Sequence, residues 1–512
     1  MNRHPTPSGE LVDLADADPF GLQSRCWRRD ADGTVHQAAR ADSLADRHTP
    51  LDAQALFEYL YFHCIPSPRT VFAGVSRVPA GHRLNFQGAQ PSLEVAWAPR
   101  FRPAEKVSFE ALREEFRTLL KASVQRAIAG DGPAACFLSG GTDSSTVAGM
   151  IREASGSGAL AFSIGFEADG YDEMEYARLA ARHFGCEHHA YYITPDDLVR
   201  SIPEVAGSYD QPFGNSSVLP AYYCAFQARQ AGVSRLLAGD GGDELYGGNA
   251  RYAKQRVFGH YQSVPAPLRS MLEPLLLQPG ISRVPILKKA ASYVEQARVP
   301  MPDRLQMYNL LLRLGIDEVL EPGFLHQVDV QGPTQHQREV WAWAGSGAMA
   351  TPPSELNRTL AYDWRYTLAE SDIPKVRGAT TLAGVEVAYP MLDPALLEFS
   401  LHLPDDYKLN GLKLRWFFKE ALRGFLPDEI INKPKHGFGL PFGPWLLRHA
   451  GLRALATDSL LSLGTRGMVR PTFINNLLSQ HLAEHPGYYG EMVWILMMLE
   501  QWFQQHRPSW RV

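Results

Sequence analysis

Residues 134–151 read AACFLSGGTDSSTVAGMI, and the order of residues in this segment is the strongest indication of the fold. An apolar run at 134–138 predicts a short buried strand, and a helix is expected from about Asp143. Between them, two adjacent glycines let the backbone curl so that successive N–H groups point at one anion. The N-terminus of the following helix adds unpaired N–H groups and a partial positive charge. The stretch therefore predicts a phosphate-binding turn between a strand and a helix.

The residues of this turn suit a phosphate ligand. Hydrogen bonds to phosphate oxygens can come from the hydroxyl groups of Ser139, Ser144 and Ser145 and from the backbone N–H groups of Gly140 and Gly141. Asp143 would repel a bare phosphate, so its presence indicates a bridging Mg²⁺. The spacing is not that of a Walker A loop, which requires G-x-x-x-x-G-K-[ST]. An ordinary capped strand–helix turn is the alternative, and the complete strand–SGGTDSS–helix context disfavours it.

Strands and helices alternate on both sides of the turn. The periodicity predicts helices over 109–127, 173–184, 195–206 and 219–231, and strands over 160–166, 188–193 and 234–238. Alternation at these lengths predicts βαβ units, and therefore an α/β fold with a parallel sheet and helices on both of its faces. From about Tyr252 onward the chain is mostly helical by its period.

A second glycine loop, AGDGGDELYGG at 238–248, follows the strand predicted at 234–238. Ligands of an open parallel sheet bind at the carboxyl ends of its strands, where both loops fall, so the two loops can share one nucleotide. Asp143 and Asp243 can then offer oxygen atoms to the same Mg²⁺. A solvated acidic turn is the alternative for this loop taken alone.

A third segment, KPKHGFGLP at 433–441, places Lys435 among glycine, proline and phenylalanine residues. Such a turn holds the ammonium group as a point charge that can be aimed into a cleft. A lysine without this context is usually a solvated surface group. The segment therefore makes Lys435 a candidate active-site cation.

The three segments together resemble a known family. SGGTDSS is similar to the pyrophosphate loop of the ATP pyrophosphatase superfamily, whose members have an adenine nucleotide alpha hydrolase-like fold and split ATP between the α and β phosphates. The loop GDGGDELYGG and the segments 387–411 and 425–447 resemble asparagine synthetases and their β-lactam-forming and lasso-peptide-cyclising relatives. The resemblance covers about 101–447, with a residual part at 51–86.

This resemblance implies roles for individual residues. Lys435 matches the catalytic lysine of the family, and Asp240 lies near the same cleft, where it can orient or deprotonate an amine. The positions that match the family's contacts with adenosine and ribose are Leu138, Ile164, Ala238 and Gly239. The resemblance therefore implies ATP and Mg²⁺ as cofactors.

The implied reaction is an ATP-dependent ligation, in which a carboxylate is adenylated with release of pyrophosphate and then forms an amide with ammonia or an amine. One form is a glutamine-independent asparagine synthetase, or an ammonia ligase fed by a separate glutaminase. The other is a secondary-metabolite synthetase that forms an amide or lactam with a different amine. A nucleotide-binding regulator built on a decayed synthetase is the non-enzymatic alternative.

The part before the synthetase-like region is short. Residues 1–50 have no sustained period and are expected to be loose, 51–105 resemble the tail of a glutaminase domain, and 106–512 form the synthetase-like domain. Asn2 stands where glutamine-dependent relatives have a cysteine nucleophile, and an amide side chain cannot act as a thiolate. The chain by itself is therefore not expected to hydrolyse glutamine.

The residues expected around the acyl substrate depart from the family. Its K-V-D-R run reads KVRG at 375–378, and its E-x-R-x-P-F-L-D pattern has Ala388 in place of the arginine. Gln211 and Asn215 stand where relatives commonly have acids. Arginine binds carboxylates through two parallel hydrogen bonds, so its loss puts aspartate in doubt as the substrate.

Composition excludes several other classes of protein. The chain of 512 residues has 50 Lys and Arg against 55 Asp and Glu, a net charge of −5, which predicts neither a nucleic-acid nor a membrane partner. Its five cysteines are scattered, which argues against a disulfide scaffold or a zinc ribbon. No apolar run approaches the ~20 residues that cross a bilayer. These features predict a soluble cytoplasmic protein.

Overall fold

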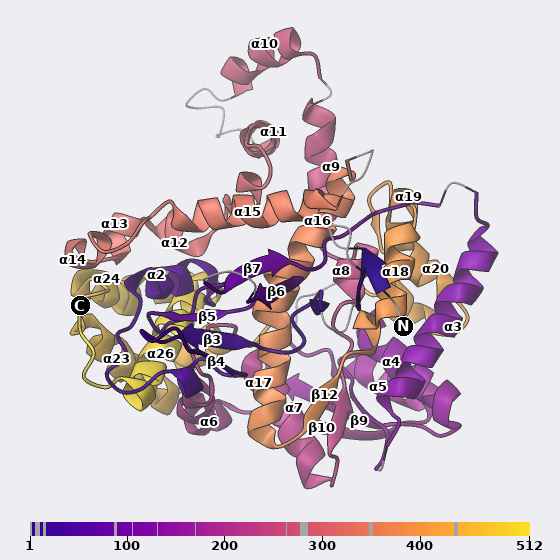
Figure 1. Cartoon of the computed structure of the whole chain (residues 1–512), viewed down its shortest axis with the longest axis horizontal. Coiled ribbons are helices and arrows are strands. Elements are labelled where there is room, and N and C mark those ends of the chain that lie inside the picture. Colours follow the sequence, from indigo (N-terminus) through magenta and orange to yellow (C-terminus); the bar gives the residue numbers. More distant parts are fainter. Residues whose placement is uncertain are drawn as a thin grey trace.

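The computed structural model describes residues 3–5, 11–13, 17–86, 90–104, 106–130, 132–168, 170–262, 264–276, 285–347, 352–434 and 439–512. At its centre is a parallel sheet of five strands in the order β10-β9-β8-β11-β12 (Figure 1). The strands are β8 (Ala135–Phe137), β9 (Leu160–Phe166), β10 (Glu187–Ile193), β11 (Arg235–Leu237) and β12 (Glu386–Ala388). In the part of the chain that is described, no helix is long and apolar enough to cross a membrane.

Helices cover both faces of this sheet, as the alternating pattern predicts. They are α3 (Phe109–Ala127), α4 (Thr142–Ser155), α5 (Met174–Phe184), α6 (Pro195–Ser208), α7 (Val218–Gln230) and α17 (Ile373–Ala383). Successive strand residues point to opposite faces, so Ala135 packs in the core that contains α6 and α7, whereas Cys136 packs in the core that contains α3, α4 and α5. The predicted α/β class and its parallel sheet are confirmed.

Two features of the sheet were not predicted. Strand β12 joins the sheet beside β11 after an excursion of the chain that is mostly helical, with Leu236 opposite Val387. A strand of three residues carries too little periodicity to be recognised, and only pairing with β11 gives it its conformation. The helix before it, α17, follows the π-helical segment η4 (Trp364–Asp372) and packs on α7.

Residues 17–104 form a module of their own beside the sheet. Strands β3 (Cys26–Arg29), β4 (Val35–Ala38) and β5 (Val75–Arg77) form an antiparallel sheet in the order β4-β3-β5. The module also contains the helix α2 (Ala53–Phe62) and the pair β6 (His82–Asn85) and β7 (Ser92–Val95). We call this part of the chain the N-terminal module.

This module differs from the sequence-based expectation. Residues 1–50 were expected to be loose, but within the described part Cys26 is buried and β3 pairs with both of its neighbours. The strands within 71–86 do not pair with each other: β5 pairs with β3, and β6 pairs with β7. The strands are short and mix charged with apolar side chains, so their pairing depends on contacts distant in the sequence.

Further elements surround this framework, and α9, α10 and α11 project from it at the top of Figure 1. They are η1 (Asp42–Leu44), α8 (Gly242–Tyr246), α9 (Ala250–Gln262), α10 (Ala266–Leu276), α11 (Pro285–Arg298), α12 (Leu310–Leu314), α13 (Ile316–Val319), α14 (Pro322–Leu325), α15 (Gly332–Ser346), α16 (Glu355–Asp363), α18 (Pro394–His402), α19 (Asp405–Lys408), β13 (Leu409–Asn410), β14 (Lys413–Leu414), α20 (Trp416–Ala421), α21 (Asp428–Asn432), α22 (Phe442–Arg448), α23 (Ala450–Gly464), α24 (Pro471–Asn476), η6 (Leu477–His481) and α26 (Pro486–His506). Helix α26 is largely buried and packs against α6, α22 and α23.

Candidate active site

The first glycine loop lies between β8 and α4. Gly140 has a φ of +70°, and a Cβ atom there would lie 2.4 Å from the backbone nitrogen of Ala177 in α5, so only glycine fits. Ser144 Oγ accepts a hydrogen bond from Ser139 N at 3.2 Å and lies 3.0 Å from Ser139 Oγ. The N-cap residue of α4 is Gly141, which provides no side-chain cap. The helix N-terminus and its partial positive charge therefore lie at the glycine loop, where they suit an anion.

The second glycine loop packs directly on the first. A Cβ atom at Gly239 would lie 2.9 Å from Ser144 N, and one at Gly242 would lie 2.0 Å from Asp143 Oδ1. The two loops follow β8 and β11, which are neighbours in the sheet, so their approach results from the strand order. The structure thus brings together the two segments that the sequence predicts to share one ligand.

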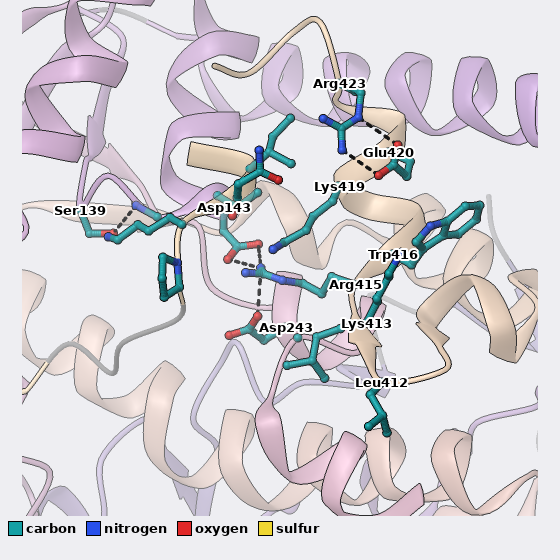
Figure 2. Close-up of a pocket in the computed structure, with 18 of the residues that line it drawn as sticks. Ser139, Asp143, Asp243, Leu412, Lys413, Arg415, Trp416, Lys419, Glu420 and Arg423 are labelled. Atoms are coloured by element: carbon teal, nitrogen blue, oxygen red, sulfur yellow. Dashed lines mark hydrogen bonds and ion pairs between the residues drawn. The ribbon is translucent and has the colours of Figure 1, made fainter. Parts of the chain in front are cut away.

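Asp143 and Asp243 converge on one cation. Arg415 Nη1 lies 2.5 Å from Asp143 Oδ2 and 2.9 Å from Asp243 Oδ1 (Figure 2). Burial by itself would lower the pKa of Arg415, but the charges of the two carboxylates outweigh burial and raise that pKa. One nitrogen atom contacts both carboxylates, which shows that a single cation can reach both.

Sequence reasoning missed Arg415. The run LRWFFKEAL offers no motif that singles it out, because its position depends on the turn between β14 and α20. Arg415 adopts a left-handed conformation with a φ of +52°, which is rare for an arginine, and its N–H donates to the carbonyl oxygen of Gly247. Strained residues of this kind concentrate at functional sites. The positive φ of Arg415 beside two acids therefore indicates a functional residue, and this signal is present only in the structure.

A cavity of about 590 Å³ opens in front of these residues, and we call it cavity A. Its charged lining residues are Asp143, Glu173, Asp243, Lys413, Arg415, Lys419, Glu420, Arg423 and Lys433. The Lys419 side chain points toward Asp143 in Figure 2, and burial followed by the charge of Arg415 lowers its pKa. Lys433 Nζ forms an ion pair with Glu173 at 2.9 Å. Cavity A therefore combines glycine-loop N–H groups with several cations, which suits a polyphosphate.

The predicted catalytic lysine lies outside the described residues. Residues 435–438, which include Lys435, are not among them. The two preceding residues, Lys433 and Pro434, line cavity A. The role of Lys435 therefore stays a prediction from the sequence.

A second cavity, of about 390 Å³, lies on the other side of Ser139, and we call it cavity B. Leu138 and Ile164, two of the predicted contacts with adenosine, line it together with Asp240, Asp372 and Lys375. The other two predicted contacts line neither cavity among the described residues. Ala238 is buried and donates its N–H to the carbonyl oxygen of Ala388, and Gly239 packs on the first glycine loop.

Asp240 and Lys375 face each other in cavity B. Burial raises the pKa of Asp240 to about 6, although Lys375, whose Nζ lies 4.0 Å from Asp240 Oδ1, lowers it in part. Burial would also lower the pKa of Lys375, but the charges of Asp372 and Asp240 outweigh it and raise that pKa. Lys375 is therefore a permanent cation held between two acids, while Asp240 can change its charge near neutral pH.

The sequence profile of the asparagine synthase family matches residues 115–504, which include both glycine loops and the 433–441 segment. The chain belongs to the asparagine synthase family. This match confirms the family suggested by the three motifs. Family membership supports an ATP-dependent amide-forming ligase in general terms.

Several curated proteins are similar to this chain. Asparagine synthetase [glutamine-hydrolyzing] 1 of Bacillus subtilis (strain 168) is 24% identical over 489 residues, covering 95% of this chain and 74% of that protein. A putative asparagine synthetase [glutamine-hydrolyzing] of Mycobacterium tuberculosis (strain ATCC 25618 / H37Rv) is 25% identical, covering 95% of this chain and 73% of that protein. Amidase chyE of Penicillium rubens is 23% identical over 463 residues, covering 77% of this chain and 63% of that protein.

Proposed function

We propose that this protein is an AMP-forming carbon–nitrogen ligase, which adenylates a carboxylate with ATP and then transfers the acyl group to an amine. One observation carries the proposal. At the carboxyl ends of β8 and β11, Asp143 and Asp243 face a single cation in front of an open glycine loop. A site that gathers two carboxylates beside a helix N-terminus suits a metal-bound polyphosphate.

The residues of cavity A account for the binding of ATP. Asp143 and Asp243 are hard oxygen donors that reach the same point, where Arg415 Nη1 now lies. They fit Mg²⁺ and would hold it once the guanidinium group moves aside for Mg·ATP, and the ion would screen the charge of the leaving pyrophosphate. The first glycine loop would bind the pyrophosphate oxygens through backbone N–H groups and the hydroxyls of Ser139 and Ser144. Lys435, by resemblance, would stabilise the charge that builds on the α-phosphate and then on the carbonyl oxygen.

The residues of cavity B account for the second half of the reaction. An amine must be neutral to attack the activated carbonyl, so a base is required. Asp240, with a pKa of about 6, is mostly ionised at neutral pH and still basic enough to take a proton. Lys375 keeps this carboxylate in place without removing its charge. Attack of the amine then releases AMP, and no covalent bond to the enzyme forms.

We also propose that the chain does not hydrolyse glutamine by itself. A glutaminase of this kind needs a cysteine thiolate. Burial raises the pKa of every cysteine in the chain: Cys26, Cys64, Cys136, Cys186 and Cys224. None of them would supply a thiolate at neutral pH, so ammonia would come from solution or from a separate glutaminase.

The lining of cavity B favours a substrate other than aspartate. Among the described residues that line cavity B, Lys375 is the one cation, and Asp372 already binds it at 2.9 Å. A small diacid would need a further cation for its second carboxylate, and the described lining residues offer none. An amide- or lactam-forming synthetase for a larger carboxylate is therefore the second candidate function.

The test is to incubate the pure protein with Mg·ATP, aspartate and ammonium, and to follow AMP, pyrophosphate and asparagine by mass spectrometry. Asparagine formed in step with AMP would establish an ammonia-dependent asparagine synthetase. AMP release only with other carboxylates or amines would establish the second candidate. ATP binding without pyrophosphate release in any mixture would instead leave a nucleotide-binding regulator.

The matched variants are Asp143→Ala and Asp303→Ala. Both side chains are partly buried, 21% and 24% exposed, and both form an ion pair with an arginine, but Asp303 lies outside the cavities. Asp143→Ala should abolish AMP formation, whereas Asp303→Ala should retain it. Equal activity in the two variants would contradict the assignment of cavity A.

A further inference from the structure

A third cavity lies where the N-terminal module meets the synthetase part of the chain, and we call it cavity C. Its volume is about 760 Å³, within the range of ~300–1,000 Å³ that is usual for small-molecule sites. One wall comes from the N-terminal module, with lining residues from 22–24, 39–40, 64–65 and 77. The other comes from the connection between α6 and α7 and from η4 and α17, with lining residues from 208–213 and, in part, from 370–382. The N-terminal module therefore completes a cavity that the synthetase part alone would leave open.

Cavity C and cavity B lie on opposite sides of the same helix. Along η4 and α17, Asp372 and Lys375 line cavity B, whereas Glu370 and Arg377 line cavity C. Tyr209, which also lines cavity C, donates a hydrogen bond to the carbonyl oxygen of Lys375 at 3.0 Å. In Figure 1, α17 runs between the N-terminal strands and the helices of the central sheet. A ligand in cavity C would thus contact the helix that positions Lys375.

Most charged groups of cavity C are already paired. Arg40 binds Asp42 through two nitrogen atoms. Arg77 Nη2 binds Glu370 Oε2 at 2.5 Å. These pairs neutralise each other and fix the walls, so they offer little to a ligand.

Two opposite charges remain. Arg377 Nη1 donates to the carbonyl oxygens of Gly21 and Leu22, while its Nε and Nη2 have no hydrogen-bond partner among the residues that the structure describes. Asp210 Oδ2 accepts from Ala41 N, and Asp210 Oδ1 has no such partner within the same part of the chain. Neither side chain forms an ion pair there. Cavity C therefore presents one guanidinium edge and one carboxylate oxygen to whatever occupies it.

The wall around Arg377 combines a cation with aromatic rings. In the run KVRG at 375–378, Arg377 is followed by Gly378. A Cβ atom at Gly378 would lie 2.3 Å from Tyr209 Cζ, so glycine is required for the Tyr209 ring to lie there. That ring stacks on Phe213 with centroids 4.8 Å apart. Cavity C is therefore lined by a guanidinium group and by a pair of stacked rings.

We propose that cavity C binds a free amino acid as a zwitterion, with the carboxylate on Arg377 and the ammonium group on Asp210. A guanidinium edge suits a carboxylate through two parallel hydrogen bonds, and a carboxylate oxygen suits an ammonium group. The stacked rings of Tyr209 and Phe213 offer an apolar surface to a side chain. The ligand is either the amine-bearing co-substrate or an effector that acts through α17, and both share this chemistry.

The test is isothermal titration calorimetry of the full chain, without ATP, against glycine, β-alanine and the other common amino acids. For any amino acid that binds, the matched probes are its decarboxylated amine and its deaminated acid. Loss of one charge-assisted contact should weaken binding by about 10- to 100-fold. No saturable binding of any amino acid, or equal binding of the singly charged probes, would overturn the proposal.

Variants locate the binding. Arg377→Gln and Asp210→Asn should each weaken binding by about tenfold or more, and Arg377→Lys should retain part of it. The control is Arg235→Gln, which removes an arginine paired with Glu386 at the far strand end, outside all three cavities, and should bind as the wild type does. Thermal melting of each variant checks folding, and Asp210→Asn stands in if Arg377→Gln fails to fold. Unchanged affinity in both cavity variants would overturn the assignment.

A second measurement separates the two sources of the ligand. The amino acid that binds is added together with Mg·ATP and a panel of carboxylates, and its concentration is followed by mass spectrometry. Consumption into an amide would make it the co-substrate. An unchanged concentration with an altered affinity for ATP would make it an effector. Because binding is measured without ATP, a failure of the ligase assignment does not affect the result for cavity C.

Discussion

Replacing Arg415 by methionine should destabilise the protein and make its stability depend on Mg²⁺. The guanidinium contacts Asp143 at 2.5 Å and Asp243 at 2.9 Å, and its side chain is 8% exposed. At an effective dielectric constant of about 20, a charge pair at ~3 Å gains about 5 kcal/mol before the cost of desolvation. Removing one partner of a buried pair costs about 3–5 kcal/mol after that cost. The two carboxylates keep about a fifth of their exposure, so we expect the lower end, about 3 kcal/mol.

Mg²⁺ should restore part of this loss. In the variant, two carboxylates that face one point have lost their cation, and a divalent ion can replace it. Binding to the folded state alone adds stability according to RT ln(1 + [L]/Kd). Methionine adopts the left-handed conformation of Arg415 no more easily than arginine does, so the strain at this position is unchanged and the difference reports the charge.

The assay is urea unfolding of wild type and variant, each with and without millimolar Mg²⁺. The control is Arg423→Met, because Arg423 also lines cavity A and binds two acids, Glu420 and Asp428, but is 44% exposed. Exposed pairs contribute less than about 1 kcal/mol, so this control should lose little. Two results would refute the two-carboxylate cation site. One is an Arg415→Met protein that is as stable as the wild type. The other is a gain in stability from Mg²⁺ that is equal in Arg415→Met and in the wild type.

Three further predictions concern activity. The turnover number should fall as the pH drops through about 6, because the pKa of Asp240 is raised to about 6 and the protonated carboxyl group cannot act as a base. In Asp240→Asn, this acidic decline should be absent from the pH–rate profile. Gly140→Ala should abolish ATP binding, measured by calorimetry, because the added Cβ atom would lie 2.4 Å from a backbone nitrogen of α5 and the residue has a φ of +70°. The control is Gly156→Ala, which also has a positive φ but has open space around it, and this variant should bind ATP normally. Lys435→Ala should lower turnover by about 10²–10³-fold with little change in ATP affinity, and near-normal turnover would contradict the family-derived role.

The chemistry of the two glycine loops could be predicted from local sequence because local rules govern it. A strand, two adjacent glycines and a helix N-terminus form a phosphate-binding turn wherever they occur together. The order of strands and helices around 134–151 also predicts a parallel sheet, and the carboxyl ends of its strands are where ligands bind. Asp143 and Asp243 could therefore be paired although a hundred residues separate them.

Other parts of the site depend on contacts that no local pattern encodes. Arg415 reaches both acids only because the β13–β14 hairpin and α20 dock against the second glycine loop, where its N–H meets Gly247. The pKa of Asp240 is raised to about 6 because its carboxyl group is buried, with Lys375 lowering it in part. Burial depends on how the wall of cavity B is assembled, which the local sequence does not record. The pairing of β5 with β3, rather than with β6, likewise joins strands that are distant in the sequence.

The family, the central α/β architecture and the two loops that meet at the strand ends can be recognised from the sequence, because each rests on residue types at short, fixed spacing. Three features are visible only in the folded chain: which cation holds the acids, how α17 separates cavities B and C, and how the N-terminal module closes cavity C. Those features join segments hundreds of residues apart, such as Arg377 and Gly21. Their energies depend on burial and charge in three dimensions, which linear spacing does not record.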